Sequence, residues 1–351
     1  MTTRVKIAAV GDILMWRRQI ASARVGNSNR YSFDNMFGAV APYLRSADLT
    51  IGNLETTLSG RESQYERRNP KTGWPMFNCP DELAAALKRV GFNVLTTANN
   101  HCMDRGVRGL VRTLHVLDRH HLPHTGTFRN RQAAQTPLIK IVKGIKFGIL
   151  AYTYGTNRIP VPQSKPWLVN RIQKPKILRD LKALRPKVDV IIVALHFGQE
   201  FKRYPNASQR SLVKTMFQQG ADIILGAHPH VLQPMAFQHT SGTGPGLKKK
   251  FVIYSLGNFI SDRMLNNIHA DSGVILNINI QKNDQGEVSI THVNYIPTWV
   301  HQRVVKGKPR FRVLPIRRFL RNSNASLSAE ARRTMRRVWK NTTSHLRGKP
   351  L

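Results

Sequence analysis

The sequence predicts an α/β fold built as a sandwich on mixed β-sheets. Through the first two thirds of the chain, short apolar runs typical of strands alternate with helical patterns. After residue 250 three strand-like runs follow one another with no helix between them, which indicates an antiparallel portion. No Walker loop, GxGxxG motif or internal repeat is present. A simple parallel nucleotide-binding fold is therefore not expected.

The spacing of apolar residues predicts the following strands and helices, given in chain order. The expected strands of the βα portion are 5–10, 48–53, 92–97, 145–152, 188–195 and 222–225. The expected helices are 35–44, 80–90, 107–120, 176–184 and 208–219, and 60–78 reads as a long surface loop. The antiparallel portion comprises 251–255, 273–280 and 288–296. From residue 306 a basic extended stretch leads to a helix near 328–339.

The chain has 351 residues, 41% of them hydrophobic, so a substantial core can form. No run of consecutive apolar residues approaches the length of a membrane-spanning helix, which needs about 18. Two cysteines, Cys79 and Cys102, cannot form a disulfide framework and fit a reducing compartment. The N-terminus enters a strand at Val5 without the pattern of a signal peptide. We therefore expect a cytoplasmic protein, unless a leader is missing, and peripheral contact with a membrane stays open.

The charge is strongly basic, with 55 Lys and Arg against 19 Asp and Glu, a formal +36. Such a field attracts polyanions, including nucleic acid, anionic lipid, phosphorylated metabolites and polyglutamate, without selecting among them. Adaptation for solubility, or a general feature of the source proteome, would explain the same charge. Residues 301–351 hold 15 Lys and Arg and one acidic residue, Glu330. We expect a domain over 1–300 and a basic C-terminal extension over 301–351 that packs on the domain or trails from it.

Polar side chains of one chemical kind follow five of the predicted strands. The groups are Asp12; Asn53 and Glu55; Asn100, His101 and Asp104; His196 and Glu200; and His228 and His230. Taken singly, each group also fits a cap, a turn or a solvated side chain, and Asn99 fits a turn residue. Five such groups at successive strand ends are hard to explain as five separate coincidences. Ligand sites of α/β folds lie outside the carboxyl ends of the strands, so one shared site explains all five groups.

Carboxylates, imidazoles and an amide oxygen form a site that suits borderline divalent metals. In an extended His-x-His segment, His228 and His230 can turn both rings to one side and reach two neighbouring ions. Glu55 can bridge the two ions. Metal pairs about 3.5–4 Å apart hold a hydroxide nucleophile and clamp both oxygens of a displacement at phosphorus.

Six ordered motifs within residues 5–300 resemble those of the CapA family of poly-gamma-glutamate capsule synthesis proteins. They are Gly-Asp at 11–12, Asn-Leu-Glu at 53–55, Ala-Asn-Asn-His-x-x-Asp-x-Gly at 98–106, His-Phe-Gly-x-Glu at 196–200, Gly-x-His-Pro-His-Val-Leu-Gln at 226–233 and Tyr-Ser-Leu-Gly-Asn-Phe at 254–259. That family is similar in fold to the calcineurin-like metallophosphatases. The resemblance implies a four-layer αββα sandwich with mixed sheets.

The resemblance also implies roles for the strand-end residues. One metal would be held by Asp12, Glu55 and His230, and the other by Glu55, Asn100, His196 and His228. His101 would be the general acid, oriented by Asp104. Arg17, Asn53, Glu200 and Asn258 would bind substrate or support the ligands. The ions would be Mn, Fe, Zn or Mg.

The chain departs from the metallophosphatase pattern at two ligand positions, and at one of them the bridging acid is Glu55 instead of an Asp. Leu14 stands where those enzymes place a His, two residues after the first Asp. The expectation is therefore two divalent ions, or one only.

These features give three hypotheses about function. The first is a metal-dependent hydrolase of a phosphoester or related anionic substrate, associated by resemblance with poly-gamma-glutamate capsule biosynthesis. The alternative is a non-catalytic accessory protein that binds an anionic polymer during capsule synthesis or export. The third, nucleic-acid binding through 301–351, rests on charge alone, because no nucleic-acid motif is present.

Overall fold

Two β-sheets form the centre of the computed structural model, which describes residues 2–239, 246–321 and 327–346. The first sheet has the order β16 (Lys308–Pro315), β15 (Val288–Val305), β14 (Ser272–Lys282), β1 (Thr3–Ile13), β2 (Leu49–Leu54), β5 (Val94–Thr96) and β6 (His124–Thr125), and β13 (Asn258–Ile260) also pairs with β1. The second sheet has the order β11 (Leu232–His239), β12 (Lys249–Leu256), β10 (Ile223–Ala227), β9 (Val190–His196), β8 (Ile145–Thr153) and β7 (Leu138–Val142).

Both sheets are mixed. In the first, β1, β2, β5 and β6 are parallel, whereas β14, β15 and β16 pair antiparallel. In the second, β8, β9, β10 and β12 are parallel, and β7 and β11 are antiparallel edge strands. Parallel strands need crossover connections, which explains why helices separate them in sequence. The predicted change from a βα to an antiparallel pattern is confirmed.

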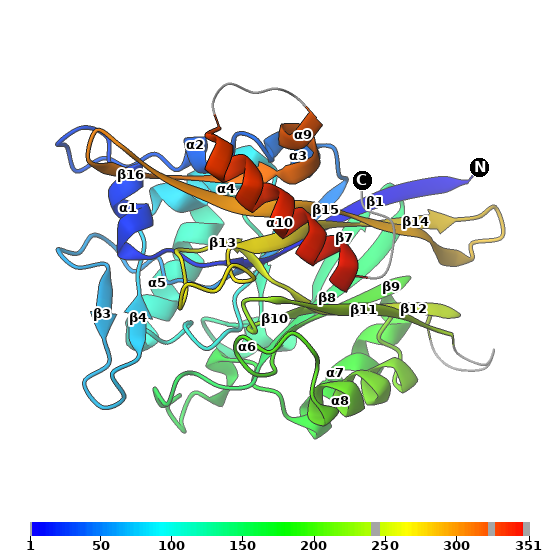
Figure 1. Ribbon diagram of the computed structural model, residues 1–351. Coiled ribbons are helices and arrows are strands. Elements are labelled where there is room, and N and C mark those ends of the chain that lie inside the picture. The colour runs from blue at the N-terminus through cyan, green and yellow to red at the C-terminus, as the bar shows by residue number, and fades with distance from the viewer. Residues whose placement is uncertain (1, 240–245, 322–326, 347–351) are drawn as a thin grey trace.

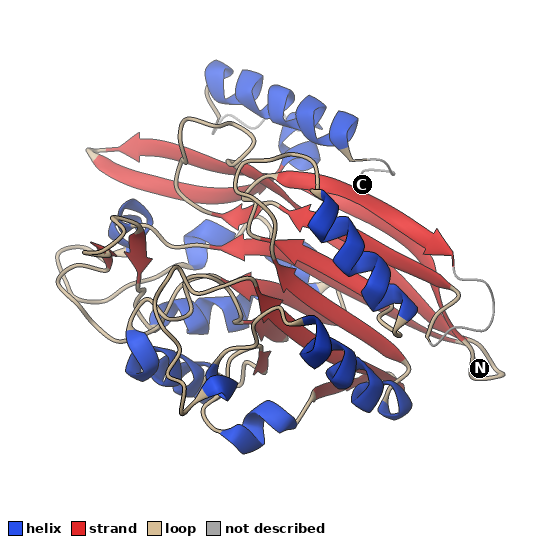
Figure 2. Cartoon of the chain, turned by 90° about the horizontal axis from the view of Figure 1, so that it is seen from below, coloured by secondary structure: helices blue, strands red, loops and turns tan. Residues whose placement is uncertain are grey.

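Helices cover the outer faces of the sheets. They are α1 (Arg17–Ala23), α2 (Asp34–Phe37), α3 (Ala41–Arg45), α4 (Glu82–Val90), α5 (Gly106–Arg119), α6 (Arg131–Gln135), α7 (Lys174–Leu184), α8 (Ala207–Gln218), α9 (Ile316–Arg321) and α10 (Ala329–His345). In Figure 1, α2, α3 and α4 lie above the first sheet and α7 and α8 below the second, whereas α10 crosses in front of the strands and contacts both β15 and β11. The view from below in Figure 2 shows helices lying across the nearer strands.

Three layers of apolar side chains hold the sheets and helices together. One fills the space between the sheets and includes Ile7, Ile51 and Ile192. The second lies between the first sheet and α1 to α5, and the third lies under α7 and α8. The predicted four-layer αββα sandwich with mixed sheets is therefore confirmed.

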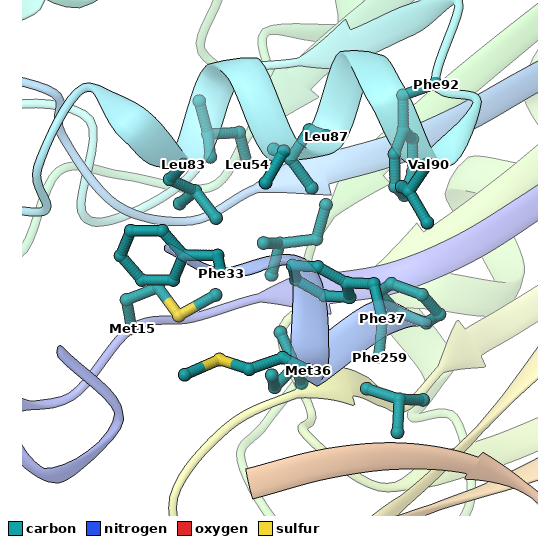
Figure 3. Close-up of a cluster of buried hydrophobic side chains, with 14 of the residues drawn as sticks. Met15, Phe33, Met36, Phe37, Leu54, Leu83, Leu87, Val90, Phe92 and Phe259 are labelled. Atoms are coloured by element: carbon teal, nitrogen blue, oxygen red, sulfur yellow. The ribbon is translucent and has the colours of Figure 1, made fainter. Parts of the chain in front are cut away.

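Helix α4 shows how sequence pattern produces this packing. Leu83, Leu87 and Val90 recur at helical spacing and are buried against the first sheet, as Figure 3 shows. The helix ends at Gly91, whose φ of 116° is a left-handed cap that favours glycine.

Several elements differ from the predictions. Strand β15 continues from the predicted 288–296 to Val305, because its outer half pairs with β16 in a long hairpin. The predicted loop 60–78 contains the hairpin β3 (Glu66–Arg68) and β4 (Pro75–Phe77). The predicted helix 35–44 is divided into α2 and α3.

Residue 300 lies inside β15, and the division of the chain at that point stays a prediction. Residues 322–326 and 347–351 of the predicted extension lie outside the described residues. Within the described ranges, no helix has the length and apolar character needed to cross a bilayer.

Candidate metal centre

The end of β1 delivers Asp12 to the edge of the first sheet. A Cβ on Gly11 would lie 1.9 Å from the Gly257 carbonyl oxygen, so only glycine permits this close approach. The β1–β2 register shifts between Val10 and Asp12. Asp12 then pairs with Asn53 of β2 on one side and with Asn258 of β13 on the other. Three polar residues predicted from the sequence thus lie side by side.

The second sheet delivers three histidines to the same edge. His196 is the last residue of β9, and β10 ends at Ala227, directly before His228. His228 and His230 have φ values of 97° and 59°, so the segment is not extended as expected but turns through two left-handed residues. Such backbone is unfavourable for residues with a Cβ and is concentrated at functional sites. It is held in place by packing, since both side chains are buried.

Four predicted ligands meet around the Glu55 carboxylate. Glu55 Oε1 lies 3.3 Å from His196 Nε2 and 4.0 Å from His230 Nε2. Asp12 Oδ2 lies 3.2 Å from His230 Nδ1. Each of two sets offers ligand atoms within 4.8 Å of one another: Glu55, His228 and His230, and Asp12, Glu55 and His196. Glu55 belongs to both sets, as expected for a bridging carboxylate.

The predicted amide ligand Asn100 joins this cluster through His196. Asn100 Oδ1 lies 2.7 Å from His196 Nε2. Asn100 Nδ2 donates to Asn157 Oδ1 at 3.1 Å. The orientation of the amide leaves its oxygen directed into the cluster, where a cation would need it.

Polar atoms in the cluster lack hydrogen-bond partners. Both carboxylate oxygens of Glu55 and Nδ1 of His228 are buried without one among the described residues. Glu55 is 0% exposed. Buried polar groups are nearly always hydrogen-bonded or bound to a metal, because desolvation without compensation is unfavourable. The donor set, two carboxylates and three imidazoles, therefore fits divalent metal ions.

The electrostatics of the cluster keep two of its three imidazoles in their ligating form, whereas at His230 burial is outweighed by hydrogen bonding and the charge of Asp12, which raise its pKa. Burial lowers the pKa of His196 to about 3. Burial and the neighbouring His196 and His230 rings lower the pKa of His228 well below 6.5. Both rings are thus neutral at pH 7, and neutral imidazole is the form that binds metals.

The two carboxyl groups respond in opposite directions. Burial raises the pKa of Glu55 well above 4.5, and the negative charges of Asp12 and Glu200 raise it further. Burial acts to raise the pKa of Asp12 as well, but hydrogen bonding from His230 and the charges of His230 and His196 outweigh it, so that pKa is lowered below 3.8. A bound cation would favour the ionised form of Glu55.

His101 and Asp104 form a pair beside the cluster. His101 Nδ1 lies 2.7 Å from Asp104 Oδ2, which also accepts a 2.6 Å hydrogen bond from the Phe77 amide. The Phe77 ring packs edge-on against His101 at 4.7 Å. This arrangement fixes the imidazole plane and places its proton donor or acceptor function at Nε2.

Three of the predicted supporting residues lie within reach of the ligands. Asn53 Nδ2 donates to Asp12 Oδ1 at 2.8 Å and lies 3.2 Å from His196 Nδ1. Asn258 Oδ1 lies 3.0 Å from His230 Nδ1. Glu200 is exposed, and its charge acts on Glu55.

Arg17 lies at the start of α1, away from the ligands that the structure brings together. Its backbone amide donates to Glu66 at 3.3 Å. It lines a separate hollow with Glu62 and Lys308. A substrate role for Arg17 stays a prediction.

Sequence reasoning assigned no role to three residues of this site. Asn99 was interpreted as a turn residue, but it is fully buried, donates to the Leu54 carbonyl at 2.7 Å and accepts from the His101 amide at 3.1 Å. Asn157 Nδ2 lies 3.4 Å from both ring nitrogens of His101. Tyr154, half exposed, lies 4.5 Å from the His228 ring. Asn157 and Tyr154 follow β8, and that strand-end position was the available signal.

Comparison with solved structures supports the fold. The chain resembles Haemophilus influenzae NAD nucleotidase with a TM-score of 0.51 and 13% identity, over 99% of this chain and 64% of that one. It resembles a putative 5'-nucleotidase from Staphylococcus aureus with a TM-score of 0.51 and 14% identity, over 96% and 58%. At this identity the likeness shows the metallophosphatase-type fold alone.

Curated relatives are found among capsule proteins. The chain is 30% identical over 268 residues to the capsule biosynthesis protein CapA of Bacillus anthracis, covering 74% of this chain and 60% of that protein. It is 28% identical over 290 residues to the PGA biosynthesis protein CapA of Bacillus subtilis (strain 168), covering 81% and 70%. The chain thus spans about 60% of the length of the first of these relatives.

The profile of the family described as "Bacterial capsule synthesis protein PGA_cap" matches residues 6–263, which include Asp12, Glu55 and all three clustered histidines. The six motifs and the geometry of the strand ends agree with this match. The chain belongs to the PGA_cap family of bacterial capsule synthesis proteins.

Proposed function

We propose that this protein is a divalent-metal-dependent hydrolase that acts on a phosphoester or related anionic substrate during the synthesis of a capsule polymer. The observation that carries the proposal is the Glu55 carboxylate, fully buried with both oxygens unbonded and surrounded by His196, His228 and His230. Without a cation this arrangement would be unfavourable. A reaction that requires a metal ion bound to Glu55 would explain why this buried carboxylate has no hydrogen-bond partner among the residues that the structure describes.

The ligands divide between two positions in this proposal. By the family resemblance, Asp12, Glu55 and His230 would hold one ion, and Glu55, Asn100, His196 and His228 the other. The ligand atoms that lie within 4.8 Å of one another group differently, with His196 beside Asp12 and Glu55, and with His228 and His230 beside Glu55. Mixed nitrogen and oxygen donors suit Mn, Fe or Zn better than Mg, which prefers oxygen alone. When bound, the ions would supply Lewis-acid stabilisation of a phosphoryl oxygen and a nucleophilic hydroxide at neutral pH.

His101 has the position of a general acid in this mechanism. Asp104 holds Nδ1 at 2.7 Å, so Nε2 is the atom from which a proton would pass to the leaving oxygen. Asn157 joins His101 to the ligand Asn100 and thereby fixes the acid relative to the metal ligands. Tyr154 and Glu200, both exposed, mark the side open to solvent.

The direct test is turnover of a phosphomonoester and a phosphodiester, p-nitrophenyl phosphate and its bis ester, by protein loaded separately with each metal. We expect activity that is lost in Asp12→Ala and His228→Ala and retained in Tyr204→Ala, because Tyr204 is 70% exposed and outside the cluster. His101→Ala should lower kcat by about 10²- to 10⁴-fold while the metal stays bound. Full metal occupancy without turnover of either ester would contradict the proposal.

The alternative is a non-catalytic accessory protein that binds an anionic polymer. The net charge of +36 favours it. It predicts that poly-gamma-glutamate binds with the same affinity to wild type and to Asp12→Ala, and that added salt weakens binding to both. Binding that disappears with the metal ligands would exclude this alternative.

A further inference from the structure

A second concentration of charge lies on one face of the β15–β16 hairpin. Arg303 pairs directly with Arg310, and His301 pairs directly with Arg312. Since alternate residues of a strand share a face, these four side chains project from the same side of the hairpin. β16 is the edge strand of the first sheet, and it packs against α1 and α2 (Figure 1).

The hairpin forms one wall of a hollow of about 680 Å³. Four arginines line it, Arg303, Arg310, Arg312 and Arg318 of α9, together with the polar side chains of Ser32 and Asn35. None of the lining residues is acidic. Within the described part of the chain, none of the four arginines forms an ion pair with a carboxylate, whereas arginines elsewhere do, among them Arg61, Arg89, Arg105 and Arg112.

A bound anion would reduce the repulsion among these arginines, of which Arg303, Arg310 and Arg318 are exposed to solvent and Arg312 is half-buried. Like charges that lie directly opposite one another on paired strands destabilise a sheet. Arg303 and Arg310 form such a pair. Burial lowers the pKa of Arg312, and the positive charge of Arg303 lowers it further. The chain itself provides little compensation: Arg310 donates to the Ser22 carbonyl at 3.1 Å, and Arg312 stacks over the Phe319 ring.

His301 lies on the same face of the hairpin, next to the arginines, although it does not itself line the hollow. It is only 6% exposed, and its Nδ1 is buried without a hydrogen-bond partner among the described residues. Burial, together with the charges of Arg303 and Arg312, lowers the pKa of His301 to about 4. In the part of the chain that the structure describes, a neutral imidazole whose Nδ1 has no partner therefore lies beside arginines that form no ion pair.

The chemistry of the hollow favours a compact phosphate-rich anion. Phosphates carry the highest charge density among common biological anions and match the forked donors of arginine. The two phenyl rings at the site are each faced by a guanidinium, Phe319 by Arg312 and Phe311 by Arg18. Nucleobases bind single-stranded sites by stacking on open aromatic faces, so the rings here do not favour a nucleic acid.

We propose that the hollow between the β15–β16 hairpin, α2 and α9 is a second binding site, separate from the metal centre, for an anion with two or more linked phosphate groups. None of its lining residues belongs to the strand-end cluster. The site does not depend on the proposed hydrolase activity, and each can fail without the other.

The test is calorimetric titration of the full chain with inorganic tripolyphosphate in the presence of EDTA. We expect saturable binding of one tripolyphosphate, weakened at least about tenfold in Arg303→Gln/Arg312→Gln, because both substitutions remove a charged hydrogen-bond donor to the anion. The matched control Arg108→Gln/Arg210→Gln removes the same charge from exposed positions on α5 and α8 and should bind like wild type. Thermal unfolding of each variant without ligand checks that it folds.

Four results would overturn the proposal. Equal weakening in both double variants would mean attraction by the overall charge. Loss of binding in Asp12→Ala would place the tripolyphosphate in the metal centre. Equal or tighter binding of a tetraglutamate peptide than of tripolyphosphate would assign the hollow to carboxylates. Absence of saturable binding to wild type would exclude a site altogether.

Discussion

The same strand ends serve two buried regions with opposite properties. Leu54 and Phe259 project into the apolar core between the first sheet and its helices, whereas their neighbours Glu55 and Asn258 face the metal centre. In the core, Phe259 stacks on Phe37 at 5.7 Å (Figure 3). On the other side, the carboxylate oxygens of Glu55 have no hydrogen-bond partner.

The difference shows how stability and function are divided along these strands. Apolar burial on one face supplies the free energy of folding that holds polar groups in an unfavourable arrangement on the other. The core should therefore be sensitive to loss of volume. The metal centre should tolerate loss of charge when no metal is bound, and should lose metal binding instead.

The largest expected effect on stability is in the core. Phe259→Ala removes a fully buried ring that contacts Phe37 and Phe92, and should lower the free energy of unfolding by about 3–5 kcal/mol. Urea denaturation measures this loss, with Tyr204→Ala as the exposed control. A Phe259→Ala protein as stable as the control would show that this core does not support the strand ends.

A smaller effect is expected at Asn99, which links the two regions. Its amide joins the Leu54 carbonyl to the His101 backbone, and both bonds are buried. Asn99→Ala leaves those groups unsatisfied and should destabilise the protein by about 1–3 kcal/mol. The exposed Asn29→Ala is the control in the same denaturation experiment. If the two variants were equally stable, the buried hydrogen bonds of Asn99 would not contribute to stability, and Asn99 would be a simple turn residue.

The smallest expected effect is the pH response of the metal-free protein. The pKa of Glu55 is raised in the folded state by burial first and by Asp12 second, whereas the unfolded value is near 4.5. As pH rises above 4.5, the unfolded state ionises and the folded state does not, so the free energy of unfolding falls until the raised pKa is reached. Glu55→Gln removes this contribution, at most about 1.4 kcal/mol per pH unit in that window. Parallel stability curves for the two proteins would contradict the assignment.

Sequence reasoning identified the ligand-bearing strand ends because residue type and strand order are local signals. Asp12, Glu55, His196, His228 and His230 each follow an apolar run, and parallel strands bring such ends to one edge. The antiparallel portion was recognisable from the absence of helices between its strands.

What escaped prediction depends on contacts between distant residues. The three-residue strand β13 exists because Asn258 pairs with Asp12, and no local pattern reports that pairing. The left-handed backbone of His228 and His230 is imposed by tertiary packing against intrinsic preference. The sequence predicts only a turn at Asn99. The burial of this residue depends on its hydrogen bond to the Leu54 carbonyl, forty-five positions away, and no local pattern reports that contact.

The central claim, that the strand ends form a metal centre organised on Glu55, is tested most directly by metal content. Wild type, Glu55→Gln and the core variant Leu87→Val would each be dialysed against Mn²⁺ or Zn²⁺, analysed for bound metal and crystallised for anomalous scattering. We predict ions beside Glu55 in wild type and Leu87→Val, and none in Glu55→Gln. Wild type without bound metal, or unchanged occupancy in Glu55→Gln, would contradict the claim.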